Sequence, residues 1–353
     1  MSGYRNRIRN VSVVTDTVRS VPADPTNYHD AFFREVMSSP VNAASELRAV
    51  LPETLAAHVD WDHLELQSTS FVTSELRPRY GDLLFRTRID SHPAYIYLLV
   101  EHQSSPDPLM AFRILEYMVS VWNHHIGHHP KTRTLPAVVP LVVYQSPSGR
   151  RWTAPLDIAE LIDLDEATRE DAAAYIPRLR YILDNVTLTD IPSLFERELT
   201  TLTRIMLTTL KTAPGNTDMF VVLEMLREDF EDILSRPAGV RDMQLVLTYI
   251  MSVGETDPAD IEKFADQLGP RAKEAFVTTA ERLSAEAEAR GEARGEARGE
   301  ARGRVAVLLE QLTLKFGHVP QHLVDTLRAG NIEQLQAWSA RVLEAERIDQ
   351  VFC

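Results

Sequence analysis

Apolar residues recur with two different periods in the first half of the chain, which distinguishes strands from helices. Residues 81–89 and 94–101 are short runs rich in aliphatic and aromatic residues, separated by the turn-forming segment 90–93. Two such runs around a short turn predict an antiparallel hairpin. The apolar run 137–144 predicts a further strand, and the stretch from Leu64 to Val72 predicts a first one.

Helical spacing appears before and after the predicted hairpin. The stretch from about Tyr28 to Leu51 has a helical pattern. Asp107 and Pro108 suit a helix start, with the Asp as N-cap and the Pro at the first helical position. Apolar residues then follow at helical spacing: Leu109, Phe112, Leu115, Val119 and Trp122. The predicted order of elements is therefore helix, three strands, helix, strand, which is an α/β fold.

Two acidic residues stand at the open end of the predicted hairpin. If the turn centres between residues 91 and 92, Asp82 and Glu101 lie directly opposite each other. Opposed carboxylates have Cβ atoms roughly 4.5–5.5 Å apart and repel each other, so the pair is costly unless something positive lies between them. A divalent cation meets that need, and Gln103 shares the strand face of Glu101. The hairpin thus predicts a metal site.

A structural interpretation of the same acids stays open. Asp82 could cap a turn while Glu101 pairs with Arg79 or Arg113. The arginines near the acidic pair have two interpretations as well, contact with a phosphate backbone or simple exposure to solvent. They are Arg77, Arg79, Arg86, Arg88 and Arg113.

Charge and composition limit the class of protein. The net charge of −14 argues against a simple DNA-binding protein, because phosphate contacts need a basic face. The segment 151–255 carries ten basic and nineteen acidic residues, so much of the excess lies outside the predicted sheet region. The single cysteine, Cys353, permits no intrachain disulfide and indicates a reducing compartment. Without a long apolar run, we expect a cytoplasmic protein that does not enter a membrane.

Other motifs carry less information. Four histidines at 124, 125, 128 and 129 could bind zinc, but they coincide with the predicted end of a helix, where they would suit its C-terminal carbonyls. The chain has no Walker loop, no Gly-x-Ser-x-Gly and no His-Glu-x-x-His. Phosphate-loop NTPases, elbow-type serine hydrolases and zincin proteases are therefore disfavoured.

The chain is predicted to have five parts. A flexible basic tail (1–24) precedes the α/β core (25–150) and a helical continuation (151–255). A helix and a strict Ala-Arg-Gly-Glu repeat form a spacer (256–303), in which four glycines cost roughly 3–4 kcal/mol of helix propensity and predict a weak helix at best. A helical C-terminal module (304–353) follows, with a core small enough that dimerisation or docking is expected. The repeat could alternatively form an oligomerising helix.

Several short sequence motifs together resemble those of the Rpn family of recombination-promoting nucleases, also called YhgA-like transposases, within the PD-(D/E)XK nuclease superfamily. The matching motifs are Tyr28-His-Asp-Ala-Phe-Phe-Arg34, Thr69-Ser-Phe-Val72, Arg79-Tyr-Gly-Asp-Leu-Leu-Phe85, Tyr97-Leu-Leu-Val-Glu-His-Gln-Ser-Ser-Pro-Asp107 and Phe112-Arg-Ile-Leu-Glu-Tyr-Met118. The resemblance spans about residues 25–250. One departure is visible, because Tyr144-Gln145-Ser146 stands where the family usually has Tyr-His-Gly.

The resemblance implies metal-dependent hydrolysis of DNA phosphodiester bonds, linked to recombination or mobile DNA. Asp82, Glu101 and the carbonyl of His102 would hold Mg²⁺ or Mn²⁺. Gln103 stands where many superfamily members have Lys, so it could orient a water but not supply positive charge. The superfamily often adds an acid from the first helix, here Asp30, Glu35 or Glu46.

The rival interpretation is a protein without catalytic activity. It is a nuclease-like module that binds DNA or protein, with structural acids in its strands, and it assembles as a homo-oligomer through its C-terminal helices. Short motifs in the last part of the chain resemble those of a small domain that is often attached to such nuclease-like proteins. A role of this part in partner binding fits that resemblance.

Overall fold

The computed structural model describes residues 28–68, 82–101 and 106–352. The chain divides into two compact units, Met1–Val277 and Thr278–Cys353. Each unit has its own hydrophobic core, and each is described by itself.

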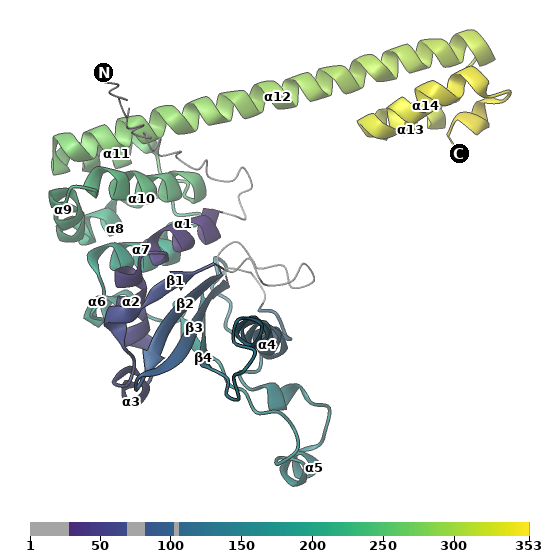
Figure 1. The fold of residues 1–353 in the computed structure, drawn as a ribbon. Helices are drawn as coiled ribbons and strands as arrows, with labels where there is room; N and C mark the ends of the chain where they lie inside the picture. Colours follow the sequence, from purple (N-terminus) through teal and green to yellow (C-terminus); the bar gives the residue numbers. More distant parts are fainter. Residues whose placement is uncertain (1–27, 69–81, 102–105, 353) are drawn as a thin grey trace, which may run out of the picture. The chain divides into compact units, whose positions relative to one another are not determined.

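A five-stranded sheet forms the centre of the first unit (Figure 1). Its strands lie in the order β1 (Glu65–Gln67), β2 (Leu83–Ile89), β3 (His92–Glu101), β4 (Ala137–Tyr144) and β5 (Ile182–Asn185). The pairs β1–β2 and β2–β3 are antiparallel, whereas β3–β4 and β4–β5 are parallel. The predicted α/β class is confirmed. The short strand β5 was not predicted, because its four residues carry no alternation or long apolar run.

The hairpin register differs from the predicted one by two residues. Leu83 pairs with Leu98 and Ile89 with His92, so the turn consists of Asp90 and Ser91. Both turn residues have positive φ angles, 47° and 71°, as a two-residue hairpin turn of the I′ type requires. The predicted direct opposition of residues 82 and 101 is therefore wrong. A shift of two residues preserves the faces of a strand, since side chains alternate with a period of two.

The first predicted helix is two helices. The segment 28–50 forms α1 (Tyr28–Met37) and α2 (Pro40–Val50), with a break at Ser38 and Ser39. Pro40 causes the break, because it has no N–H to donate and disfavours helical geometry in the residue before it. The Asn42 side chain donates a hydrogen bond of 2.9 Å to the carbonyl of Val36 and so satisfies a helix end left by the break.

The remaining helices of the first unit lie before, between and after the sheet strands in sequence. The helix after the hairpin begins at Met110, two residues later than predicted, and Asp107 accepts a hydrogen bond of 2.9 Å from the backbone N–H of Leu109. The bounds are α3 (Glu53–Ala56), α4 (Met110–His128), α5 (Glu166–Asp171), α6 (Ile191–Glu196), α7 (Thr201–Thr212), α8 (Phe220–Met225), α9 (Arg227–Ser235), α10 (Gly239–Val253) and α11 (Pro258–Leu268).

Helices cover both faces of the sheet. The side chains of Leu84, Tyr97, Leu99 and Val142 pack with the buried side of α4. The alternate residues of the same strands point to the opposite face. In Figure 1, α4 lies on one side of the sheet and α1, α2 and α7 lie on the other. Helix α4 therefore covers the face of β2 and β3 on which the predicted acidic pair lies.

The second unit is helical. Helix α12 begins at Pro270, within the first unit, and runs without a break through the whole Ala-Arg-Gly-Glu repeat to Phe316. The low stability expected for the repeat as a helix stays a prediction. Alanine has the highest helix propensity, and a helix that is nucleated in flanking segments extends through the repeat without a new nucleation step. An ion pair at i,i+4 spacing joins Arg304 to Glu300 near the end of the repeat.

A small core supports the C-terminal helices. The helices α13 (Gln321–Ala329) and α14 (Ile332–Glu344) pack with the last part of α12 around Trp338. Asn331 caps α14 through a reciprocal capping box with Gln334. The core of these helices contains Leu308, Leu312, Leu327, Leu335, Trp338, Val342, Ala345 and Val351.

Candidate active site

Asp82 and Glu101 come together at one end of the sheet, on the face covered by α4. Asp82 directly precedes β2, and Glu101 is the last residue of β3. With the β2–β3 register continued by one residue, Asp82 stands opposite Leu99, which shares a strand face with Glu101. The acids are thus diagonal neighbours, for which a spacing of about 7–8 Å is typical. Both are buried, with 2% and 0% of their surface exposed.

Arg113 lies between the two carboxylates. It is in the first turn of α4, and its Nη1 donates a hydrogen bond of 3.3 Å to Oε2 of Glu101. Its Nη2 lies 3.9 Å from Oδ2 of Asp82, and its Nη1 lies 4.0 Å from Oδ2 of Asp107. The structural alternative, in which Glu101 pairs with Arg113, is therefore present in the structure. One guanidinium thus lies among three carboxylates.

Two stacked tyrosines form the wall of the site. The Tyr97 hydroxyl donates a hydrogen bond of 2.8 Å to Oδ2 of Asp82. The rings of Tyr97 and Tyr117 stack with centroids 3.5 Å apart and an interplanar angle of 9°. Burial, followed by the negative charge of Asp82, raises the pKa of both hydroxyls well above its ordinary value. Both tyrosines are therefore neutral at physiological pH.

The backbone around the acids is also held in place. Arg34 of α1 donates a hydrogen bond of 2.9 Å from Nη1 to the carbonyl of Asp82. The carbonyl of Glu101 accepts a hydrogen bond of 3.1 Å from the N–H of Gln145, which follows β4. Gln145, in the position where the family usually has His, is buried and its Oε1 has no hydrogen-bond partner among the residues that the structure describes. Three elements, α1, α4 and the end of β4, thus fix the acidic pair.

Sequence reasoning did not identify Tyr97 and Arg34 as residues of the site. Tyr97 had a usable signal, because residues 97, 99 and 101 share one face of β3 and the tyrosine pairs with Leu84, two residues after Asp82 on the same face of the sheet. The only signal for Arg34 was its position in one of the motifs that resemble the family. Its role depends on how α1 lies against the sheet, which local patterns do not reveal.

Several predicted site residues lie elsewhere or outside the described segments. His102, Gln103, Arg77 and Arg79 fall outside the described ranges. Arg86 pairs with Glu65 on β1 at 2.6 Å, and Arg88 is exposed on the strand β2. Of the acids in the first helical stretch, Glu35 pairs with Arg241 of α10 at 2.9 Å. Asp30 lies in the first turn of α1.

Glu46 belongs to a separate buried cluster on the other face of the sheet. Glu101 pairs with Tyr144 of β4, and Asp184 of β5 pairs with Val143, the residue before Tyr144. Because side chains alternate along a strand, the Asp184 side chain points to the face opposite to that of Glu101. Arg197 contacts both oxygens of Asp184, at 2.8 and 3.0 Å, and Oε1 of Glu46 at 3.3 Å. Burial, with the nearby Asp184 charge, raises the pKa of Glu46 well above its ordinary value. Glu46 therefore does not complete the Asp82–Glu101 pair.

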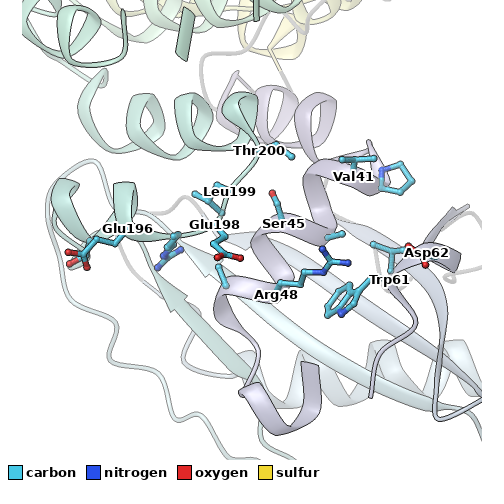
Figure 2. Close-up of a pocket in the computed structure, with 15 residues that line it drawn as sticks. Val41, Ser45, Arg48, Trp61, Asp62, Glu196, Glu198, Leu199 and Thr200 are labelled. Atoms are coloured by element: carbon cyan, nitrogen blue, oxygen red, sulfur yellow. The ribbon is translucent and has the colours of Figure 1, made fainter. Parts of the chain in front are cut away.

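A pocket of about 960 Å³ lies between α2 and the chain that leads from α6 into α7 (Figure 2). Arg48 lies over the ring of Trp61, with 5.2 Å between the guanidinium carbon and the ring centroid. Glu196 and Glu198 supply negative charge along its lining. None of the residues that line this pocket is a predicted site residue.

The histidine tract serves the end of α4. Nδ1 of His128 lies 2.9 Å from the carbonyl oxygen of His124, and Nδ1 of His129 lies 3.1 Å from that of His125. The rings of His125 and His129 stack with centroids 4.5 Å apart, whereas those of His124 and His128 are tilted at 44° with centroids 4.2 Å apart. These contacts support the interpretation as partners of the helix C-terminus. Within residues 28–68, 82–101 and 106–352, no group of three or more His, Cys, Asp or Glu side chains converges as metal ligands.

The donor set of Asp82 and Glu101 fits a hard divalent cation in part. Carboxylate oxygens are the ligands that Mg²⁺ prefers, and this ion commonly uses one or two carboxylates and keeps several waters. The two acids are buried on one face next to a cation, so a positive charge is already accommodated between them. The predicted third ligand, the carbonyl of His102, lies outside the described segments.

Comparison with known proteins places this chain in a family. Residues 27–240 match the family model described as "Putative transposase, YhgA-like". The chain is 29% identical over 260 residues to "Recombination-promoting nuclease RpnD" of Escherichia coli O157:H7, which covers 72% of this chain and 93% of that protein. It is also 29% identical over 266 residues to "Recombination-promoting nuclease RpnA" of Escherichia coli (strain K12), with 74% and 84% covered.

A further relative carries a different name. "Inactive recombination-promoting nuclease-like protein RpnE" of Escherichia coli (strain K12) is 28% identical over 262 residues, with 73% of this chain and 82% of that protein covered. No solved structure matches the chain. In the described segments, no helix combines the length and apolar character that a membrane crossing needs. The match to the family model over more than half of the chain shows that the protein belongs to the YhgA-like, or Rpn, family of transposase-like proteins related to recombination-promoting nucleases.

Proposed function

We propose that this protein is a Mg²⁺-dependent DNA endonuclease with a PD-(D/E)XK-type core, linked to recombination or mobile DNA. The observation that carries the proposal is the meeting of Asp82 and Glu101, both buried, on one sheet face around a cationic group. The names of the relatives RpnD and RpnA support the nuclease activity and its link to recombination.

Each residue of the site would have a separate role. Asp82 and Glu101, with the carbonyl of His102, would hold Mg²⁺ or Mn²⁺, and such an ion lowers the pKa of a bound water and stabilises charge on a phosphoryl oxygen. Tyr97 keeps the Asp82 carboxylate in position through its 2.8 Å hydrogen bond. Arg34 and Gln145 fix the backbone of the two acids through their carbonyls. The chain thus supplies a rigid carboxylate pair at the end of two strands.

Gln103 would limit the rate of the reaction. An amide carries no positive charge and does not act as a base at neutral pH, so Gln103 can orient a water or contact the phosphate only through hydrogen bonds. Because Gln103 replaces a charged residue at this position, we expect slow or conditional cleavage of DNA. Rapid cleavage by the wild-type protein, together with no gain for Gln103→Lys, would contradict it.

A second candidate function is a nuclease-like module that binds DNA or protein without cleaving it. Two observations favour it: relatives such as RpnE carry the word "inactive" in their names, and Arg113 already compensates the acidic pair. In this case Asp82 and Glu101 would be structural, and metal would change neither stability nor DNA affinity.

The other expectations from the sequence belong to the same proposal. A cytoplasmic location and the five-part division of the chain stay predictions. Homo-oligomerisation through the C-terminal helices also stays a prediction, and exposed apolar side chains there, such as Leu314 at 81% and Leu343 at 78%, provide surface for it.

The test is cleavage of supercoiled plasmid by the purified protein with Mg²⁺ and with chelator. Asp82→Ala and Glu101→Ala should lose the metal-dependent nicking, provided that circular dichroism shows both to be folded. Asp90→Asn is the control, because Asp90 is an exposed acid in the turn of the same hairpin and Asn also accepts its positive φ angle. An intact plasmid, with no effect of metal on melting temperature or DNA affinity, would favour the binding module.

A further inference from the structure

Arg113 and Arg197 hold their carboxylates in different ways. Arg197 makes two short contacts with Asp184, at 2.8 and 3.0 Å, in a bidentate arrangement. Arg113 makes one hydrogen bond of 3.3 Å to Glu101, and its Nη2 is 3.9 Å from Asp82. This Nη2 is buried and has no hydrogen-bond partner among the residues that the structure describes. Arg113 is therefore held mainly by charge and not by a fitted hydrogen-bond fork.

Arg113 lies close to three carboxylates. Asp82 and Glu101 are buried, and Asp107 adds a third carboxylate 4.0 Å away. Carboxylate oxygens are also the ligands that a divalent cation prefers. A divalent cation on the same oxygens would repel the guanidinium at close range. The two cations therefore compete for one pair of acids.

We propose that Arg113 is an exchangeable counter-ion that occupies the place of the metal in the free protein and leaves the Asp82–Glu101 pair when the metal binds. This inference rests on the proposed function. Arg113 starts from the first turn of α4 and keeps one fifth of its side chain exposed, so its guanidinium has access to solvent. Once released, it can bind a phosphate oxygen of the DNA, for which the guanidinium is well suited. Metal binding and DNA binding are thereby coupled through one side chain.

The test measures Mn²⁺ affinity without DNA, by calorimetry, in the full-length wild-type protein and in Arg113→Gln. Gln keeps a hydrogen-bond donor for the carboxylates but removes the competing charge. The variant should bind Mn²⁺ at least about fivefold more tightly, the lower end of coupling between linked binding events. Arg204→Gln is the matched control, since Arg204 is a half-buried arginine paired with Asp229 at 3.0 Å. Its Mn²⁺ affinity should equal that of the wild type.

A second measurement follows the released guanidinium. With Ca²⁺ in place of Mg²⁺ to suppress cleavage, wild-type affinity for a short duplex should rise when the metal is added, and Arg113→Gln should lose this rise. Equal Mn²⁺ affinity of the wild type and Arg113→Gln would overturn the exchange while leaving the proposed function intact. The absence of Mn²⁺ binding in every variant would instead remove the metal site and the proposed function with it.

Loss of Arg113 removes a cation that contacts two buried acids and could prevent folding. If Arg113→Gln is unfolded without metal, refolding on addition of Mn²⁺ supports the exchange. If it stays unfolded, the wild type decides through the salt dependence of its DNA binding. A released guanidinium adds one phosphate contact, so the slope of log K against log salt for a short duplex should steepen by about one when Ca²⁺ is added. An unchanged slope overturns the exchange.

Discussion

The Tyr97 hydroxyl donates a 2.8 Å hydrogen bond to Asp82, whereas the hydroxyl of Tyr117, stacked on the same ring, has no hydrogen-bond partner among the described residues. Tyr97→Phe should therefore lower the free energy of unfolding by about 1–3 kcal/mol, because it removes a hydrogen bond to a buried carboxylate. Tyr117→Phe should leave stability unchanged or slightly higher, since removal of an unpaired buried hydroxyl carries no such penalty.

Urea unfolding of the two variants measures this difference. The rings and their stacking stay the same in both, so each variant is the control for the other. An equal loss of stability in both would contradict the assigned hydrogen bonds. A loss of plasmid nicking in Tyr117→Phe without a loss of stability would place its hydroxyl in contact with the substrate.

Glu46 should make stability depend on pH. Its pKa in the folded protein is raised above the ordinary value of 4.5, by burial and then by Asp184. A group with a raised pKa stabilises the fold fully below its unfolded pKa, and this contribution is lost as the pH rises through the folded pKa. Glu46→Gln resembles the protonated form and removes the titration. The variant should therefore gain stability relative to the wild type as the pH increases above 4.5.

Urea unfolding at intervals from pH 5 to pH 9 would show the effect. Arg197 and Asp184 are the charged groups that contact or face Glu46, and both remain in the variant. A stability difference between Glu46→Gln and the wild type that stays constant over this range would contradict a raised pKa.

Two glycines in the second unit should respond to alanine in opposite directions. A Cβ at Gly295, in the repeat, would meet nothing within 4 Å, so Gly295→Ala should stabilise α12 by roughly 0.5–1 kcal/mol. A Cβ at Gly330 would lie 2.5 Å from the Trp338 ring, so Gly330→Ala should lower the melting temperature of the C-terminal core. Circular dichroism and thermal unfolding measure both. Destabilisation by Gly295→Ala would contradict an uninterrupted helix.

Replacement of Gln103 tests why turnover should be slow. Gln103→Lys introduces the positive charge that many superfamily members have at this position, so we expect the nicking rate to increase. The control is Gln103→Glu, which changes the charge in the opposite direction and should not increase the rate. Equal nicking rates in the wild type and Gln103→Lys would show that the residue does not limit catalysis.

Local patterns predicted the elements of the sheet well but not the contacts that depend on exact register. The run 137–144 corresponds to β4 without change, because a continuous apolar run bounded by polar residues is a strong signal. The hairpin was predicted with its turn one residue too late. Asp90 can adopt a positive φ angle, and this moved the turn towards the N-terminus.

The site could be predicted only in part for the same reason. Asp82 and Glu101 were correctly placed on one face, since an error of two residues keeps the alternation of side chains. Their direct opposition was wrong, and the contributions of Arg34 and Tyr97 were missed because they depend on tertiary packing. Glu46 shows the limit most clearly: it is a buried acid in the expected helical stretch, but α2 places it on the far face of the sheet.

The most direct test of the central claim compares two buried glutamates. Glu101 and Glu46 are both fully buried, and each lies 3.3 Å from an arginine nitrogen, on opposite faces of one sheet. The measurement is the rate of Mg²⁺-dependent plasmid nicking by Glu101→Gln and Glu46→Gln at neutral pH, after both are shown to be folded. We predict a loss of at least roughly 100-fold for Glu101→Gln, as expected for a lost metal ligand, and a near wild-type rate for Glu46→Gln. Equal rates in the two variants would contradict an active site at Asp82 and Glu101.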